Sequence, residues 1–199
     1  MGTLITSIDI GLVELGISLA KVNMETCTIQ KILRAENINL IEITNQTCRP
    51  LKCPYYCKSS INKKERKNFA HYIFHFLEKY EYVYFNSRIR TILIERQPYT
   101  VFTTLEQILH FKYPERVILQ SPTSLGKFLG TLGLEREEKK KKSVEMAAPY
   151  VPDKLILKHD FCDSICYILF FLEEKKNENF YFVDKKNPFK KFVWHKKYL

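Results

Sequence analysis

The chain has 199 residues, of which 45% are hydrophobic and 14% aromatic, and its formal net charge at pH 7 is +10. This composition excludes a disordered chain and suffices for one globular domain with a substantial core. The basic charge favours a polyanionic partner, either nucleic acid or an anionic membrane surface.

The start of the chain and its cysteines indicate where the protein works. Asp9 and Glu14 interrupt the first apolar residues and no basic leader precedes them, which argues against a secretory signal peptide. The apolar run at residues 165–172 is too short to cross a bilayer. Six cysteines without a secretory signal are typical of reduced thiols. We expect an intracellular protein in a cytosol-like reducing compartment, neither secreted nor attached to a membrane.

The first half of the chain predicts mainly strands. Runs of β-branched and apolar residues, separated by short polar turns, predict an antiparallel meander. We expect its strands over residues 4–12, 16–22, 28–33 and 38–43. Residues 45–62 carry three cysteines and two prolines with little periodicity, and they predict a surface loop.

The second half alternates helices and strands. Helical periodicity covers residues 62–80, 103–111, 135–148 and 159–175. Strands are expected over 91–98 and 116–120, and the helix between them implies a parallel crossover. Three glycines in residues 124–133 predict a mobile or backbone-exposed segment, and residues 177–199 form a basic, aromatic tail.

Four carboxylates stand in apolar surroundings. Asp9 lies within an apparently buried strand, where an uncompensated charge costs several kcal/mol, and Glu95 ends another such strand. Asp160 and Asp163 are three residues apart and share one face of the last helix. Each feature has a simpler interpretation: Asp9 can cap a turn at a strand end, and two first-turn acids can balance a helix dipole.

Taken together, the four acids point to metal-assisted chemistry. Carboxylates from three distant segments can converge into an all-oxygen site, which favours Mg²⁺ or Mn²⁺. Two such ions about 4 Å apart can activate a water and stabilise the leaving oxygen of a phosphodiester.

A second metal pattern lies between residues 48 and 75. Cys53 and Cys57 are followed by His71 and His75 at a spacing like that of a zinc finger. Cys48 is a third cysteine that this four-ligand pattern does not use, and such patterns often arise by chance. The alternative is that the segment binds no metal. Cysteines 162 and 166, and phenylalanines 69, 76, 170 and 171, are expected in the core.

Five blocks in order carry a resemblance to a known family. They are Ser7-Ile8-Asp9-Ile10-Gly11, Ile94-Glu95-Arg96-Gln97-Pro98, Ser121-Pro122 through Gly130, Lys141-Lys142-Ser143-Val144-Glu145 and His159-Asp160-Phe161-Cys162-Asp163-Ser164. In these blocks the chain resembles the RuvC-like Holliday junction resolvases of the RNase H-like superfamily, in particular the poxvirus branch. The gap between Asp9 and Glu95 is longer than usual for the family, and we attribute the extra length to an insert near residues 45–62 and the basic helix start after it.

The resemblance implies a fold and a metal site. The fold is α/β: a single RNase H-like domain over residues 1–199, with a central five-stranded mixed sheet flanked by helices. Two Mg²⁺ or Mn²⁺ ions are implied at Asp9, Glu95, Asp160 and Asp163, which also serve as catalytic residues.

The resemblance also implies basic residues at the site. A catalytic lysine matches Lys127, with Lys142 as the alternative, and its role is to neutralise charge developing on the scissile phosphate. Further DNA contacts are expected from Arg96, Gln97 and the run Lys139, Lys140, Lys141 and Lys142. The alternative for that run is a solvated charged face of an exposed helix.

The implied activity is paired, symmetric cleavage of four-way DNA junctions, with no small-molecule substrate. Two cuts require two active sites, so a homodimer is expected; a viral protein of this kind would act in the infected-cell cytoplasm. Two rivals remain at this stage. One is a different RNase H-like nuclease acting on RNA–DNA hybrids or flaps, and the other is a non-catalytic basic nucleic-acid-binding module.

Overall fold

The central element is one mixed sheet, seen in a computed structural model that describes residues 2–11, 13–48, 53, 69–96, 103–151 and 159–183. The strand order is β3-β2-β1-β4-β5. β1, β2 and β3 pair antiparallel, whereas β4 and β5 run parallel to β1. The predicted five-stranded mixed sheet, its meander and its crossover are confirmed. The strands are β1 (Thr3–Ile10), β2 (Glu14–Asn23), β3 (Thr28–Asn39), β4 (Ile89–Glu95) and β5 (Val117–Gln120).

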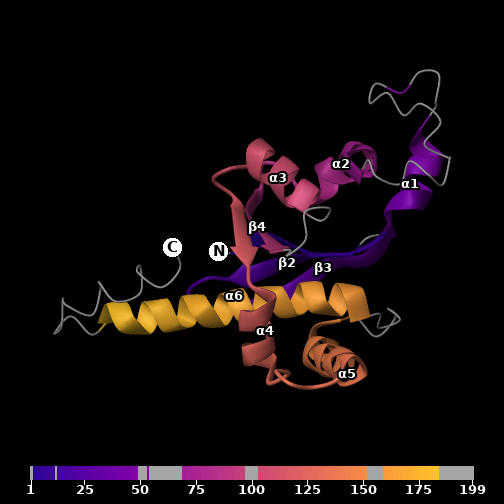
Figure 1. Cartoon of the computed structure of the whole chain (residues 1–199). Coiled ribbons are helices and arrows are strands. Elements are labelled where there is room, and N and C mark those ends of the chain that lie inside the picture. The colour runs from indigo at the N-terminus through magenta and orange to yellow at the C-terminus, as the bar shows by residue number, and fades with distance from the viewer. Residues whose placement is uncertain are drawn as a thin grey trace.

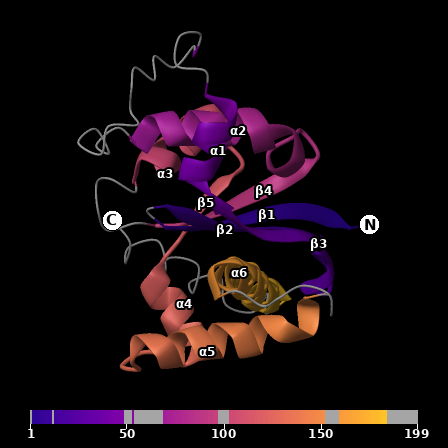
Figure 2. The same ribbon diagram turned by 90° about the vertical axis from the view of Figure 1, so that its right-hand side faces the viewer.

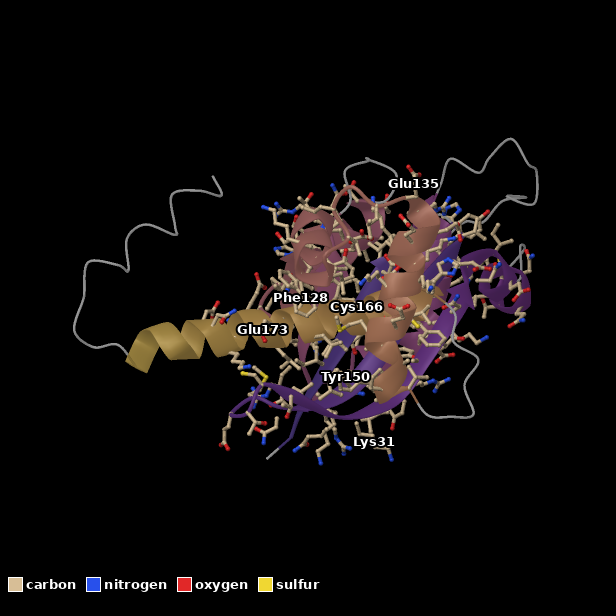
Figure 3. All side chains as sticks on the ribbon, turned by 90° about the horizontal axis from the view of Figure 1, so that it is seen from below. Lys31, Phe128, Glu135, Tyr150, Cys166 and Glu173 are labelled. Atoms are coloured by element: carbon tan, nitrogen blue, oxygen red, sulfur yellow. The ribbon has the colours of Figure 1, made fainter. Side chains whose placement is uncertain are left out.

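Helices cover both faces of this sheet. α1, α2 and α3 lie on one face and α6 lies on the other, with α4 and α5 beyond α6 (Figures 1 and 2). Seen from below, α5 crosses α6 close to Cys166, whose thiol donates to the Ser143 carbonyl oxygen at 3.5 Å (Figure 3). The helices are α1 (Leu40–Thr47), α2 (Phe69–Tyr84), α3 (Thr103–Lys112), α4 (Pro122–Leu129), α5 (Arg136–Ala147), the 3₁₀ turn η2 (Ala148–Tyr150) and α6 (His159–Val183).

The alternation of side chains along β1 and β4 divides the core into two layers. Ile8 and Ile94 pack toward α2 and α3, whereas Ile5 and Leu93 pack toward α6. Successive residues of a strand point to opposite faces. The odd-numbered residues at the ends of the two strands, Asp9 and Glu95, therefore belong to the α6 face.

Two predicted segments are corrected by the structure. The strand expected over residues 38–43 is wrong, because β3 continues to Asn39 and α1 begins at Leu40. The Asn39 side chain accepts a hydrogen bond from the Glu42 backbone N–H at 3.0 Å, which caps the new helix. The expected mobile segment over residues 124–133 is largely helical, because Ser121 caps α4 and Gly130, at φ 65°, ends it in the left-handed conformation.

The remaining expectations are confirmed where the structure describes them. α2 ends at Tyr84 rather than at residue 80, and α6 extends beyond residue 175 to Val183, into the predicted tail. Residues 45–47 of the predicted loop belong to α1; apart from Cys48 and Cys53, the remainder of that loop and residues 184–199 lie outside the described residues. Among the described residues, no helix is long and apolar enough to span a membrane. The expected core residues Phe76, Cys162, Cys166, Phe170 and Phe171 are buried, whereas the Phe69 side chain lies outside what the structure describes.

Candidate active site

Asp9 and Glu95 are neighbours at the carboxyl ends of two parallel strands. The register pairs Ile8 with Ile94, and the two acids follow these residues directly. Their side chains are hydrogen-bonded to each other. Two carboxylates can share a hydrogen bond only when one of them carries a proton, so this close approach favours the protonated form of Asp9.

Gly16 brings the last helix over this pair. It lies opposite Asp9 in the antiparallel register of β1 and β2. A Cβ atom on Gly16 would lie 1.9 Å from the Asp160 backbone carbonyl oxygen, a separation that no two such atoms tolerate. Glycine at this position therefore permits the first turn of α6 to pack closely against β2, next to Asp9.

Three acids share one pocket. Asp9, Glu95 and Asp163 line a cavity of about 140 Å³ together with Lys139, Ser143 and Tyr167. Tyr167 donates a hydrogen bond to Glu95. The Ser143 hydroxyl lies within hydrogen-bonding reach of Asp163 and also of the Lys139 carbonyl oxygen, 3.3 Å away. Protein atoms enclose the Asp9 side chain, yet part of it is accessible from the pocket. We call this cavity the three-acid pocket.

Burial, followed by repulsion between like charges, raises the pKa of two of these acids. Burial raises the pKa of Asp9 well above its ordinary value, and repulsion by Glu95, Asp163 and Asp160 raises it further. Burial also raises the pKa of Asp163 to about 6, although the hydrogen bond from Ser143 opposes the rise. Negative charge is therefore under-compensated in the three-acid pocket, and a bound cation would relieve it.

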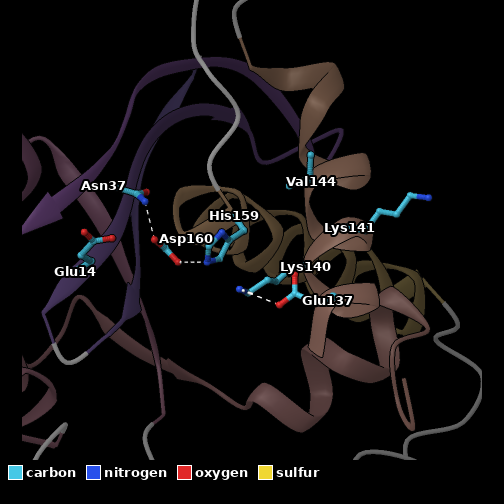
Figure 4. Close-up of a pocket in the computed structure, with 8 residues that line it drawn as sticks. All are labelled: Glu14, Asn37, Glu137, Lys140, Lys141, Val144, His159 and Asp160. Atoms are coloured by element: carbon cyan, nitrogen blue, oxygen red, sulfur yellow. Dashed lines mark hydrogen bonds and ion pairs between the residues drawn. The ribbon is translucent and has the colours of Figure 1, made fainter. Parts of the chain in front are cut away.

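Asp160 faces an adjoining, larger cavity of about 600 Å³ (Figure 4). The Asn37 amide donates to Asp160 Oδ2 at 2.6 Å, and His159 Nε2 lies 2.8 Å from Oδ1. Asn37 also accepts the Phe161 backbone N–H at 3.1 Å, so it ties β3 to the start of α6. The Asp160 charge acts on both Asp9 and Asp163, but its carboxylate does not line the three-acid pocket.

The basic candidates are distributed unequally around the two cavities. Lys139 lines the three-acid pocket, whereas Lys140 and Lys141 line the Asp160 cavity. Lys127 and Lys142 are exposed and line neither of the two. Arg96 is exposed directly after β4, and Gln97 lies outside the described residues.

The predicted zinc residues that the structure describes, Cys53, His71 and His75, lie in the α1–α2 layer, away from α6. Cys53 and His75 come together with Cys48, which the sequence pattern left over. His71 is not part of this cluster, and Cys57 lies outside the described residues.

Several site residues escaped the sequence analysis. Tyr167 follows Asp163 by four residues and Ser143 follows Lys139 by four, so helical spacing alone could have placed each on the pocket side of its helix. Asn37 has no comparable signal, because only the folded sheet brings β3 beside the start of α6. His159 precedes Asp160 directly and was not assigned a role.

Comparisons with known proteins place this geometry on a known fold. No protein-family model and no curated protein sequence matches the chain. Thermus thermophilus RuvC in complex with a Holliday junction substrate is 13% identical, with a TM-score of 0.52 over 88% of this chain and 96% of that chain. Fowlpox virus resolvase in complex with substrate Holliday junction DNA is 17% identical, with a TM-score of 0.54 over 86% of this chain and 98% of that chain. A separate structure of the fowlpox virus Holliday junction resolvase is 15% identical, with a TM-score of 0.51.

The likeness defines the fold class. At these identities it concerns the fold alone, and the expected RNase H-like fold with its five-stranded mixed sheet is confirmed. The chain is thus structurally similar to RuvC and to a poxvirus Holliday junction resolvase over most of its length.

Replacing Gly16 tests the close approach of α6 to β2. We expect Gly16→Ala to lower the free energy of unfolding by about 1–3 kcal/mol, because the added methyl group collides with the Asp160 backbone. Thermal unfolding measures the effect. The control is Gly126→Ala within α4, where the nearest atom at 3.1 Å is the tip of the Leu132 side chain and alanine favours a helix. Equal melting temperatures for Gly16→Ala and wild type would contradict the geometry.

The raised pKa of Asp163 predicts an unusual pH dependence without divalent cations. Because this pKa of about 6 exceeds the unfolded value of 3.8, the folded state binds more protons between these values. The contribution to stability is therefore full below about pH 4 and is lost as the pH rises through 6. Asp163→Asn stays neutral, so its melting temperature relative to wild type should rise by a few degrees between pH 5 and pH 8 in EDTA. A difference that does not change with pH would refute the shift.

Proposed function

We propose that this protein is a metal-dependent endonuclease that resolves four-way DNA junctions. The observation that carries the proposal is the three-acid pocket, in which Asp9, Glu95 and Asp163 meet on an RNase H-like fold. The structural neighbours include a RuvC and a viral resolvase that were each solved with Holliday junction DNA, which supports the choice of substrate.

The three-acid pocket fits a hard divalent cation. Its acidic donors are all carboxylate oxygens, and burial together with their mutual repulsion raises the pKa of Asp9 and of Asp163. We assign Asp9, Glu95 and Asp163 as ligands, with Asp160 as the fourth carboxylate of a site for two ions. When bound, Mg²⁺ or Mn²⁺ supplies water activation and stabilisation of the leaving oxygen.

The chain's own residues prepare this site for a phosphodiester. Tyr167 and Ser143 hold the Glu95 and Asp163 side chains through hydrogen bonds, so they are positioning residues. Lys139 lines the pocket, and its ammonium group would neutralise charge developing on the scissile phosphate. The sequence assigned the role of catalytic lysine to Lys127, or alternatively to Lys142. We propose Lys139 for this role instead.

The surrounding charge suits a branched polyanion. The net charge of +10 supplies affinity for phosphates, and α5 presents consecutive lysines beside both cavities. Arg96 and Gln97, which follow β4, complete the proposed DNA contacts. Two symmetric cuts, each leaving a 3′-hydroxyl and a 5′-phosphate, require two such sites, so the proposed active form is a homodimer.

Cleavage of a synthetic four-way junction tests the function. We expect paired cuts in Mg²⁺ or Mn²⁺, weak or no cutting in Ca²⁺, and little cutting of an RNA–DNA hybrid or a flap. Preferential cutting of the hybrid or the flap would favour a different nuclease of the same fold. Binding without cleavage under every metal and pH condition would leave only a non-catalytic binding module.

Removing single acids tests the ligand set. We replace one acid at a time, in Asp9→Asn, Asp160→Asn and Asp163→Asn. Loss of a residue that only hydrogen-bonds to a metal ligand typically costs about 10–100-fold in activity. Each of these variants should lower the cleavage rate by more than that, because each removes a charge that binds the metal directly. Junction binding, measured in Ca²⁺ by gel shift, should change little. Glu145→Gln, an exposed acid on α5, is the matched control and should cleave normally. Full activity in Asp163→Asn would remove the mechanism.

Comparison of three lysine variants tests the basic residue. Lys139→Ala should lower kcat by about 10²–10³-fold, the range typical for loss of one charge-stabilising donor. Lys127→Ala and Lys142→Ala should affect junction affinity more than kcat, because both side chains are exposed and line neither cavity. Single-turnover kinetics separate the two effects. A larger loss of kcat in Lys127→Ala than in Lys139→Ala would restore the assignment made from sequence.

A further inference from the structure

A second cluster of metal-ligating side chains lies on the other face of the sheet. It joins Cys48, which caps the end of α1, with Cys53 and with His75 in α2. Figures 1 and 2 show α1 and α2 together, across the sheet from α6 and α5. We infer that Cys48, Cys53 and His75 bind a structural zinc ion.

The spacing of the ligand atoms suits one tetrahedral ion. One ligand atom from each residue lies within 4.8 Å of the other two, and Cys53 Sγ lies 3.4 Å from His75 Nε2. Zn–S bonds of about 2.3 Å and Zn–N bonds of about 2.0 Å place neighbouring ligand atoms roughly 3.6 Å apart in a tetrahedron. Cys48 and Cys53 form no disulfide within the described residues, so both sulfurs can serve as metal ligands.

The hydrogen bonds of the His75 ring fix which nitrogen can bind metal. Thr47 Oγ1 donates to the Ile43 carbonyl oxygen at 2.8 Å, so it accepts from His75 Nδ1–H, 3.0 Å away. With the proton on Nδ1, the Nε2 lone pair faces Cys53 Sγ and is the one that can bind a metal. The Glu78 carboxylate, 3.6 Å from Nδ1, further supports this tautomer. Such outer partners are typical of zinc-bound histidine.

Donor chemistry distinguishes this site from the three-acid pocket. Two sulfurs and an imidazole nitrogen favour zinc over Mg²⁺, whereas a site made of carboxylates alone favours Mg²⁺ over zinc. A structural zinc takes four ligands, and the described residues supply three. The fourth comes from water or from a donor outside the described residues, and the inference does not depend on which.

The zinc site would link α1 to α2, because its ligands come from the end of α1, from Cys53 and from α2. Cys53 lies five positions after Cys48, and His75 lies 22 positions after Cys53, so one ion would close both segments. His75 is 1% exposed, which places the ion at the inner side of α2 rather than at its solvent face. Metal binding of this kind contributes directly to folding stability. Its role is structural and does not rest on the proposed nuclease activity.

Metal analysis of the full chain tests the inference. Protein purified without chelator should contain about one zinc ion per chain, and zinc removal should lower the melting temperature. Cobalt added to the metal-free wild type should give thiolate-to-cobalt charge-transfer bands, a readout that requires no variant to fold. Absence of both zinc and these bands would overturn the inference.

Variants then assign the ligands. Cys48→Ser, Cys53→Ser and His75→Asn should lose most of the zinc, measured as metal per chain in the folded fraction. Cys27→Ser and His110→Asn are matched controls outside the cluster and should retain it. His71→Asn should also retain it. Equal zinc loss in His71→Asn and His75→Asn, with zinc retained in Cys48→Ser, would contradict the ligand set proposed from the structure. It would support the set predicted from the sequence, in which both histidines bind the ion and Cys48 does not.

Discussion

Mutual repulsion among buried carboxylates is the constraint on which the proposed site depends. Asp9 and Glu95 adjoin because β1 and β4 run parallel in a register that ends both strands at the same edge. Asp163 joins them from α6, and burial then raises the pKa of Asp9 and of Asp163. Such an arrangement destabilises the metal-free protein at neutral pH. A bound cation would make this placement of the three acids favourable. The loss of folding stability without a cation is therefore explained by the proposed metal-binding function.

The rest of the fold brings α6 to this edge and holds it there. Gly16 leaves room for the Asp160 backbone, and Asn37 bonds both the Asp160 side chain and the Phe161 N–H. α5 then packs across α6 and adds Lys139 and Ser143 to the pocket. On the opposite face, α1 and α2 form a separate layer with its own cluster of sulfur and nitrogen donors. The sheet thus separates two kinds of metal chemistry.

Short-range periodicity accounts for what the sequence could predict. The apolar runs placed Asp9 and Glu95 on buried strands, and helical spacing placed Asp163 on the same helix face as Asp160. Local patterns could not show that Asp160 turns toward Asn37, because that partner lies on β3, 123 residues away in sequence. They also misjudged residues 38–43 and 124–133, where a single capping side chain begins a helix. Lys139 and Cys48 were placed by tertiary packing alone.

Direct location of the cation tests the central claim most closely. Crystals soaked in Mn²⁺ and measured for anomalous scattering would show where the ion binds. The account predicts a peak within coordination distance of the Asp9, Glu95 and Asp163 carboxylates, and its loss in Asp9→Asn. A manganese peak elsewhere, with these three carboxylates left unligated at saturating Mn²⁺, would contradict it.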